Sequence, residues 1–94
     1  MICWALEKGI HVVSDEIYAN STFPDQTMIS AADVMHERNK GQNLYLSDYV
    51  HIVAGLSKDF GVSGFRIGWL FSHNLKLLNA ISNIGYFQSV SHLT

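Results

Sequence analysis

The sequence predicts an α/β fold, in which helices and strands alternate along the chain. Three continuous apolar runs, rich in β-branched and aromatic residues, are typical of buried strands. Segments with helix-forming composition or helical spacing stand before, between and after these runs. Continuous apolar strands need cover on both faces, and three strands make a small sheet, so we expect the chain to be a fragment of a larger domain.

The first half of the chain is predicted to run helix, strand, helix. Residues 2–9, ICWALEKG, have helix-forming content and end at a glycine, where helices often stop. Residues 10–18, IHVVSDEIY, are an apolar, β-branched run that predicts a strand buried on both faces. Residues 30–38, SAADVMHER, predict a helix with Ser30 as its N-cap and Asp33 as the partner in a capping box.

The second half is predicted to run strand, turn, strand, helix. Residues 50–54, VHIVA, form the second buried strand, and residues 65–72, FRIGWLFS, form the third. A glycine-containing turn joins these two strands. From Asn74 to the end of the chain, apolar residues recur at helical spacing, beginning with Leu75, Leu78 and Ile81.

The composition argues against several kinds of partner and site. A net charge of −2 with six scattered Lys and Arg residues provides no basic stripe for nucleic acid. Cys3 is the only cysteine, which excludes a disulfide within the chain and predicts a small buried side chain, and the five histidines lack metal-ligand spacing. No apolar run reaches the roughly 18 residues of a membrane span. We therefore expect a cytoplasmic protein with no metal, nucleic-acid or membrane site.

Reactive side chains fall at the predicted strand ends. In open α/β sheets, ligands bind outside the carboxyl ends of the strands. The residues at such places are Asp15 and Tyr18, Ser57 and Lys58, and Arg66. Burial of a lysine at a strand end favours the neutral, nucleophilic amine of Schiff-base chemistry, although the same position also suits a surface-loop lysine.

The order and spacing of these residues resemble a known family. Asp15-Glu16-Ile17-Tyr18, Ser57-Lys58 and Gly64-Phe65-Arg66-Ile67-Gly68 resemble the cofactor-binding motifs of the class I/II aminotransferase family of pyridoxal-phosphate enzymes. The likeness spans roughly residues 5–94, includes the interval of eight residues between Lys58 and Arg66, and is greatest to 1-aminocyclopropane-1-carboxylate synthase-like members. The resemblance implies a three-layer α/β/α architecture, of which residues 1–94 would be a partial large domain, truncated at both ends.

The resemblance also implies a role for each matching residue. Lys58 would form a Schiff base with pyridoxal 5'-phosphate and later move the proton at the α-carbon of an α-amino acid substrate. Asp15 would pair with the pyridine nitrogen, and Tyr18 would bind the phenolic oxygen. Ser57 and Arg66 would hold the phosphate. The resemblance also implies that the intact parent enzyme is a homodimer.

Two alternatives stay open from the residues themselves. Tyr18 also suits an aromatic core position, and Arg66 also suits a surface ion pair.

The chain departs from the family at one position. Three residues before the lysine, the family usually has a serine or threonine whose hydroxyl binds the phosphate, and this chain has Gly55. The second hypothesis for the whole chain is a non-catalytic fragment or degenerate copy that acts, if at all, as an interaction protein.

Overall fold

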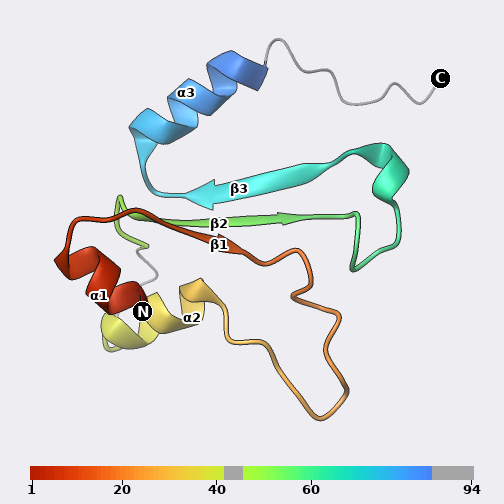
Figure 1. Cartoon of the computed structure of the whole chain (residues 1–94), viewed down its shortest axis with the longest axis horizontal. Coiled ribbons are helices and arrows are strands. Elements are labelled where there is room, and N and C mark those ends of the chain that lie inside the picture. The colour runs from red at the N-terminus through yellow and green to blue at the C-terminus, as the bar shows by residue number, and fades with distance from the viewer. Residues whose placement is uncertain (42–45, 86–94) are drawn as a thin grey trace.

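The computed structural model describes residues 1–41 and 46–85 (Figure 1). Every predicted helix and strand is present, with its ends moved by a few residues. The first predicted strand is cut to four residues because residues 17–20 form a turn. The predicted last helix begins as expected, and its part from residue 86 onward lies outside the described residues. In chain order the elements are α1 (Ile2–Glu7), β1 (Val12–Asp15), α2 (Ala31–Arg38), β2 (Val50–Gly55), the 3-10 turn η1 (Ser63–Phe65), β3 (Gly68–Ser72) and α3 (Leu75–Gly85).

The three strands form one mixed sheet in the order β1-β2-β3. β1 and β2 are parallel, with Asp15 opposite Val53, whereas β2 and β3 are antiparallel, with Gly55 opposite Gly68. The carboxyl ends of β1 and β2 therefore lie at the same edge as the start of β3 (Figure 1). This edge, which we call the carboxyl edge, is where the sequence predicts the reactive side chains.

The core lies between the sheet and the two N-terminal helices. Met35 of α2 packs with Leu46 and with Val50 of β2, and all three are at most 3% exposed. Ile2 and Leu6 of α1 pack against the same cluster. The first two helices thus cover one face of the sheet because their apolar residues meet its central strand.

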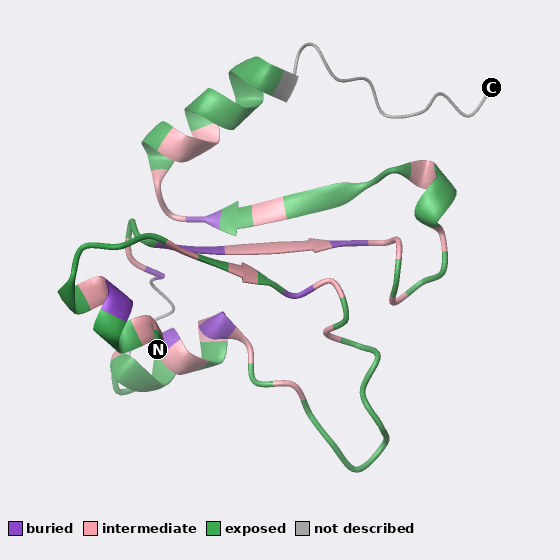
Figure 2. Ribbon diagram, in the orientation of Figure 1, coloured by how far each residue is buried: buried purple, intermediate pink, exposed green. Residues whose placement is uncertain are grey.

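The rest of the sheet is open in the described part of the chain (Figure 2). Val13, Trp69 and Phe71 are 63%, 49% and 43% exposed, so the prediction of strands buried on both faces is wrong for these residues. Two layers are present, and the described residues do not form the third layer of an α/β/α sandwich. Cys3 is also exposed, which corrects the expectation of a buried side chain.

A buried carboxylate joins the end of β1 to the start of α2. Glu16, only 6% exposed, accepts hydrogen bonds from the Ser30 hydroxyl at 2.8 Å and from the Ala31 amide at 2.8 Å. The predicted capping box is confirmed, because the Ser30 hydroxyl accepts from the Ala32 amide and Asp33 accepts from the Ser30 amide. The acid at the helix N-terminus complements its positive dipole end. Glu16 therefore fixes α2 against β1.

None of the helices that the structure describes is both long and apolar enough to pass through a bilayer. No group of three or more His, Cys, Asp or Glu side chains within residues 1–41 and 46–85 is arranged to hold a metal ion.

Candidate functional site

The fold brings the five predicted site residues to the carboxyl edge. Asp15 is the last residue of β1, and Tyr18 lies in the turn that follows it. Ser57 and Lys58 lie in the turn that follows β2, and Arg66 lies between η1 and β3. Three separate chain segments therefore deliver an amine, a carboxylate, a phenol, a hydroxyl and a guanidinium to one edge of the sheet.

Strand geometry predicts that neighbouring side chains point to opposite faces of the sheet. In agreement with this, Asp15 and Glu16 do not form a pair of facing carboxylates. Glu16 is turned into the interface with α2, whereas Asp15 is exposed. One carboxylate oxygen of Asp15 accepts the Ile17 amide at 3.2 Å, which starts the turn after the strand. Asp15 alone is thus available to a ligand at this edge.

Lys58 is exposed, so the expectation that it is buried at the strand end is wrong for the described structure. It lies in a turn of residues 57–60, in which its carbonyl accepts the Gly61 amide at 3.4 Å. Gly61 has a φ of +64°, in the left-handed region that glycine adopts without strain. The backbone of this turn, rather than a tightly packed pocket, determines where the Lys58 amine lies.

Tyr18 and Arg66 are also exposed. Tyr18 is 58% exposed, which excludes the alternative of an aromatic core residue in the described structure. Arg66 has a φ of +55°, and its Nη1 donates to the Ser63 carbonyl at 3.3 Å. That distance is slightly beyond the usual range for an N–H···O bond, so the guanidinium gives up little by turning to an anion.

Gly55 lies in a crowded part of the carboxyl edge. It is buried, and a Cβ atom there would lie 3.0 Å from the Ile67 carbonyl oxygen and 3.2 Å from Cδ1 of Ile17. Ile67 is fixed because the same carbonyl accepts the Leu56 amide at 3.1 Å. A side chain at this position would therefore crowd the Ile67 carbonyl and the Ile17 side chain.

Asp59 is a residue of this edge that the sequence analysis does not identify. Its carboxylate accepts the Ser21 hydroxyl at 2.5 Å and the Asn20 amide at 2.9 Å. These partners lie 38 and 39 residues earlier in the chain, a separation to which no spacing rule applies. In the sequence, the one sign of a role for Asp59 is its position next to Lys58.

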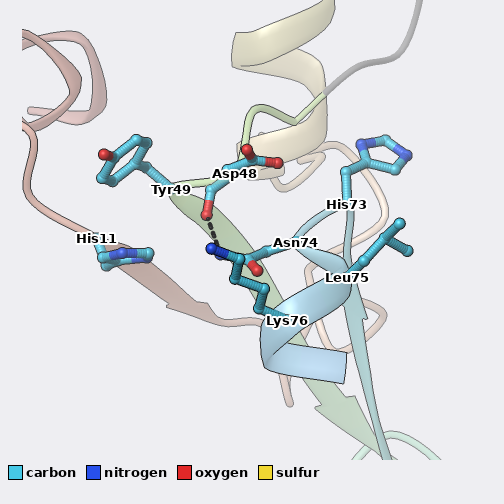
Figure 3. Close-up of a pocket in the computed structure, with 7 residues that line it drawn as sticks. All are labelled: His11, Asp48, Tyr49, His73, Asn74, Leu75 and Lys76. Atoms are coloured by element: carbon cyan, nitrogen blue, oxygen red, sulfur yellow. Dashed lines mark hydrogen bonds between the residues drawn. The ribbon is translucent and has the colours of Figure 1, made fainter. Parts of the chain in front are cut away.

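A hollow lies at the opposite edge of the sheet, away from the five site residues. It has a volume of about 540 Å³ and is open to solvent. Figure 3 shows the Asn74 side chain donating to the Asp48 carbonyl, at 2.9 Å, across this hollow. Its lining residues are His11, Asp48, Tyr49, His73, Asn74, Leu75 and Lys76.

Next to this hollow, a chain of hydrogen bonds runs from His11, the residue before β1, through β2 to β3. Nδ1 of His11 lies 2.8 Å from Nε2 of His51, and Nδ1 of His51 lies 2.7 Å from the Ser72 hydroxyl. His51 is 2% exposed. Two doubly protonated rings would bring two N–H groups face to face, so the contact requires at least one neutral ring.

We expect the chain to lose stability as the pH falls below the ordinary histidine pKa of 6.5. Burial and then the neighbouring His11 lower the pKa of His51, and Asp48 opposes them only in part. The unfolded chain therefore binds a proton more tightly than the folded chain, so stability is highest above pH 6.5 and declines below it. Thermal unfolding midpoints across this range should fall less steeply for His51→Gln than for the exposed control His36→Gln. Equal slopes in the two variants would contradict this assignment.

Comparisons with known proteins find the family that the sequence motifs resemble. The family described as "Aminotransferase class I and II" matches residues 2–94. The 1-aminocyclopropane-1-carboxylate synthase of Malus domestica is 36% identical over 94 residues, which is 100% of this chain and 20% of that protein. The 1-aminocyclopropane-1-carboxylate synthase 1 of Oryza sativa subsp. indica is 43% identical over 89 residues, which is 93% of this chain and 18% of that protein.

A third relative carries a different description. The Homo sapiens protein named "Probable inactive 1-aminocyclopropane-1-carboxylate synthase-like protein 2" is 37% identical over 91 residues, which is 97% of this chain and 15% of that protein. The chain thus spans one fifth or less of the length of these three relatives. Since the family match covers residues 2–94, nearly the whole chain, the chain belongs to the aminotransferase class I and II family.

Proposed function

We propose that the chain supplies the cofactor-binding edge of a pyridoxal 5'-phosphate-dependent enzyme that acts on α-amino acids. The observation that carries this proposal is the convergence of Asp15, Tyr18, Ser57, Lys58 and Arg66 at the carboxyl edge of one sheet. Names of the relatives favour 1-aminocyclopropane-1-carboxylate synthase-like chemistry, with amino transfer as the alternative reaction. By analogy with the family, the intact enzyme would be a homodimer.

The chemistry of these side chains fits the cofactor. An amine matches its aldehyde, a carboxylate its ring nitrogen, and a phenol its ring oxygen. A guanidinium and a hydroxyl match its phosphate. When bound, pyridoxal phosphate supplies an electron sink that stabilises negative charge at the substrate α-carbon.

Each residue has a distinct task in this proposal. The amine of Lys58 would hold the cofactor through its aldehyde. The same amine would accept the proton from the α-carbon of the substrate. Asp15 would pair with the ring nitrogen, and Tyr18 would donate to the ring oxygen. Arg66 and Ser57 hold the phosphate, and exposure of the arginine leaves room for a bidentate contact.

The attachment of the cofactor to Lys58 is testable by visible absorbance. Titration of the chain with pyridoxal 5'-phosphate should produce the band of the lysine-bound cofactor. Lys58→Ala should abolish this band, whereas Lys76→Ala, which removes an exposed lysine on α3, should retain it. A band of equal strength in both variants, or none in the wild-type chain at saturating cofactor, would refute the proposal.

A synthase and a protein named as inactive match the chain about equally well, at 36% and 37% identity. The second hypothesis, a non-catalytic fragment, predicts no band in the wild-type chain.

Two assays of the intact enzyme would separate synthase from aminotransferase activity. One measures release of 1-aminocyclopropane-1-carboxylate, and the other measures transfer of the amino group to a keto acid.

A further inference from the structure

Asp59 uses both of its carboxylate oxygens to hold a distant part of the chain. Oδ1 accepts the Ser21 hydroxyl at 2.5 Å, and Oδ2 accepts the Asn20 backbone amide at 2.9 Å. Hydrogen bonds to an ionised carboxylate are shorter and roughly twice as strong as those between neutral groups. Asp59 therefore makes a charge-assisted, two-point contact at the protein surface.

The two segments joined by Asp59 are those that carry the proposed cofactor residues. Asn20 ends the turn of residues 17–20 that contains Tyr18, and the Ser21 amide donates to the Tyr18 carbonyl at 3.0 Å. Asp59 itself follows Lys58 directly. The contact thus ties the turn after β1 to the turn after β2, beyond the last residue pair of their ladder, Asp15 with Val53.

The link persists at neutral pH. The Ser21 hydroxyl, followed by the Asn20 amide, lowers the pKa of the Asp59 carboxyl. The carboxylate is therefore ionised, and able to accept both hydrogen bonds, throughout the range in which a cofactor would bind. Because the Lys58 side chain is exposed, its reach is set by the backbone of the turn that Asp59 holds.

We propose that Asp59 is a positioning residue, which holds the Lys58 turn at a fixed place relative to the Asp15–Tyr18 segment through Ser21 and Asn20. The role rests on the proposed function, since it concerns the approach of the Lys58 amine to a cofactor that Asp15 and Tyr18 orient. Loss of the link would leave the amine present and chemically intact but poorly placed. Misplacement by about 1 Å is enough to slow a reaction by up to ~100-fold.

The test compares the rates at which individual lysines of the whole chain react with pyridoxal 5'-phosphate. Borohydride fixes the product, and peptide mass spectrometry reports the modification of Lys58 relative to Lys76 in the same sample. Ser21→Ala removes one hydrogen bond to Asp59 without altering any residue near Lys58 in sequence. We expect it to lower the ratio of Lys58 to Lys76 modification by roughly tenfold, in line with the loss of a charge-assisted hydrogen bond.

Two matched variants separate positioning from general damage. Thr22→Ala deletes a hydroxyl one residue away, at an exposed position, and should leave the ratio unchanged. Ser21→Thr keeps a hydroxyl and should restore the ratio. As a readout without cofactor, hydrogen exchange of the Asn20 amide should accelerate in Asp59→Ala while amides of α2 keep their protection.

The outcomes distinguish this inference from the proposed function. If the wild-type chain modifies Lys58 selectively and Ser21→Ala does so equally, the positioning role is wrong and the proposed function stands. If the wild-type chain shows no selectivity for Lys58, the proposed function fails and the positioning role fails with it. Slower modification in Ser21→Ala, Asp59→Ala and Thr22→Ala alike would also overturn the role, since it would reflect general disruption of the loop.

Discussion

Replacing Glu16 with alanine is expected to lower the free energy of unfolding by about 3 kcal/mol. The buried carboxylate accepts hydrogen bonds from the Ser14 hydroxyl at 2.9 Å, from the Ser30 hydroxyl and from the Ala31 amide. Alanine would leave the buried amide at the start of α2 without its acceptor, and hydrogen bonds to charged groups contribute about 1.5–3 kcal/mol each. Small domains have only about 5–15 kcal/mol of total stability, so the loss is large.

Denaturant unfolding of three variants measures this contribution. Glu16→Ala should show the full loss, and Glu16→Gln should lose less because an amide oxygen still accepts one hydrogen bond. Glu7→Ala, at an exposed position of α1, serves as the control and should change the unfolding midpoint little. If Glu16→Ala unfolded at the same denaturant concentration as Glu7→Ala, the account of how α2 is fixed to β1 would be wrong.

Introducing a hydroxyl at the position of Gly55 is expected to destabilise the chain by about 1–3 kcal/mol, as overpacking typically does. The added Cβ would lie 3.0 Å from the Ile67 carbonyl oxygen, which is backbone and already accepts the Leu56 amide. It would also lie 3.2 Å from the end of the Ile17 side chain. Gly55→Ser should therefore lower stability and fail to tighten cofactor binding, even though it restores the residue type usual in the family.

Gly64→Ser is the matched control for this substitution. A Cβ at Gly64 meets nothing within 4 Å, so the same change there should cost little. The double variant Ile17→Ala with Gly55→Ser should recover part of the stability lost by Gly55→Ser, measured against Ile17→Ala alone, because it removes the movable neighbour. Equal stability of Gly55→Ser and Gly64→Ser by denaturant unfolding would contradict the steric explanation.

Local sequence signals predicted the elements well because their causes are local. Ser30 and Asp33 form the predicted capping box, since it depends on residues within one helical turn. Asp15 ends β1, and Lys58 lies in the turn after β2, since apolar runs that end in polar residues mark where a strand leaves the core. The prediction of an α/β chain with three strands is confirmed.

Features that depend on distant partners were not predictable. Apolar content suggested cover on both faces of the sheet, yet Val13 and Phe71 are exposed, because α1 and α2 pack on one face near β2. The link from Asp59 to Ser21 and the crowding around Gly55 both arise from loops that are brought together only by folding. The exposure of Lys58 likewise depends on what surrounds the turn and not on its own sequence.

The central claim, that Lys58 is the attachment point of the cofactor, is tested most directly by locating the modified lysine. The wild-type chain is incubated with pyridoxal 5'-phosphate, reduced with borohydride and digested, and the mass of each lysine-containing peptide is recorded. We expect modification to saturate at one equivalent on Lys58, with Lys8, Lys40 and Lys76 reacting slowly. Modification spread evenly over these lysines, or absent from Lys58, would contradict the assignment of the carboxyl edge as a cofactor site.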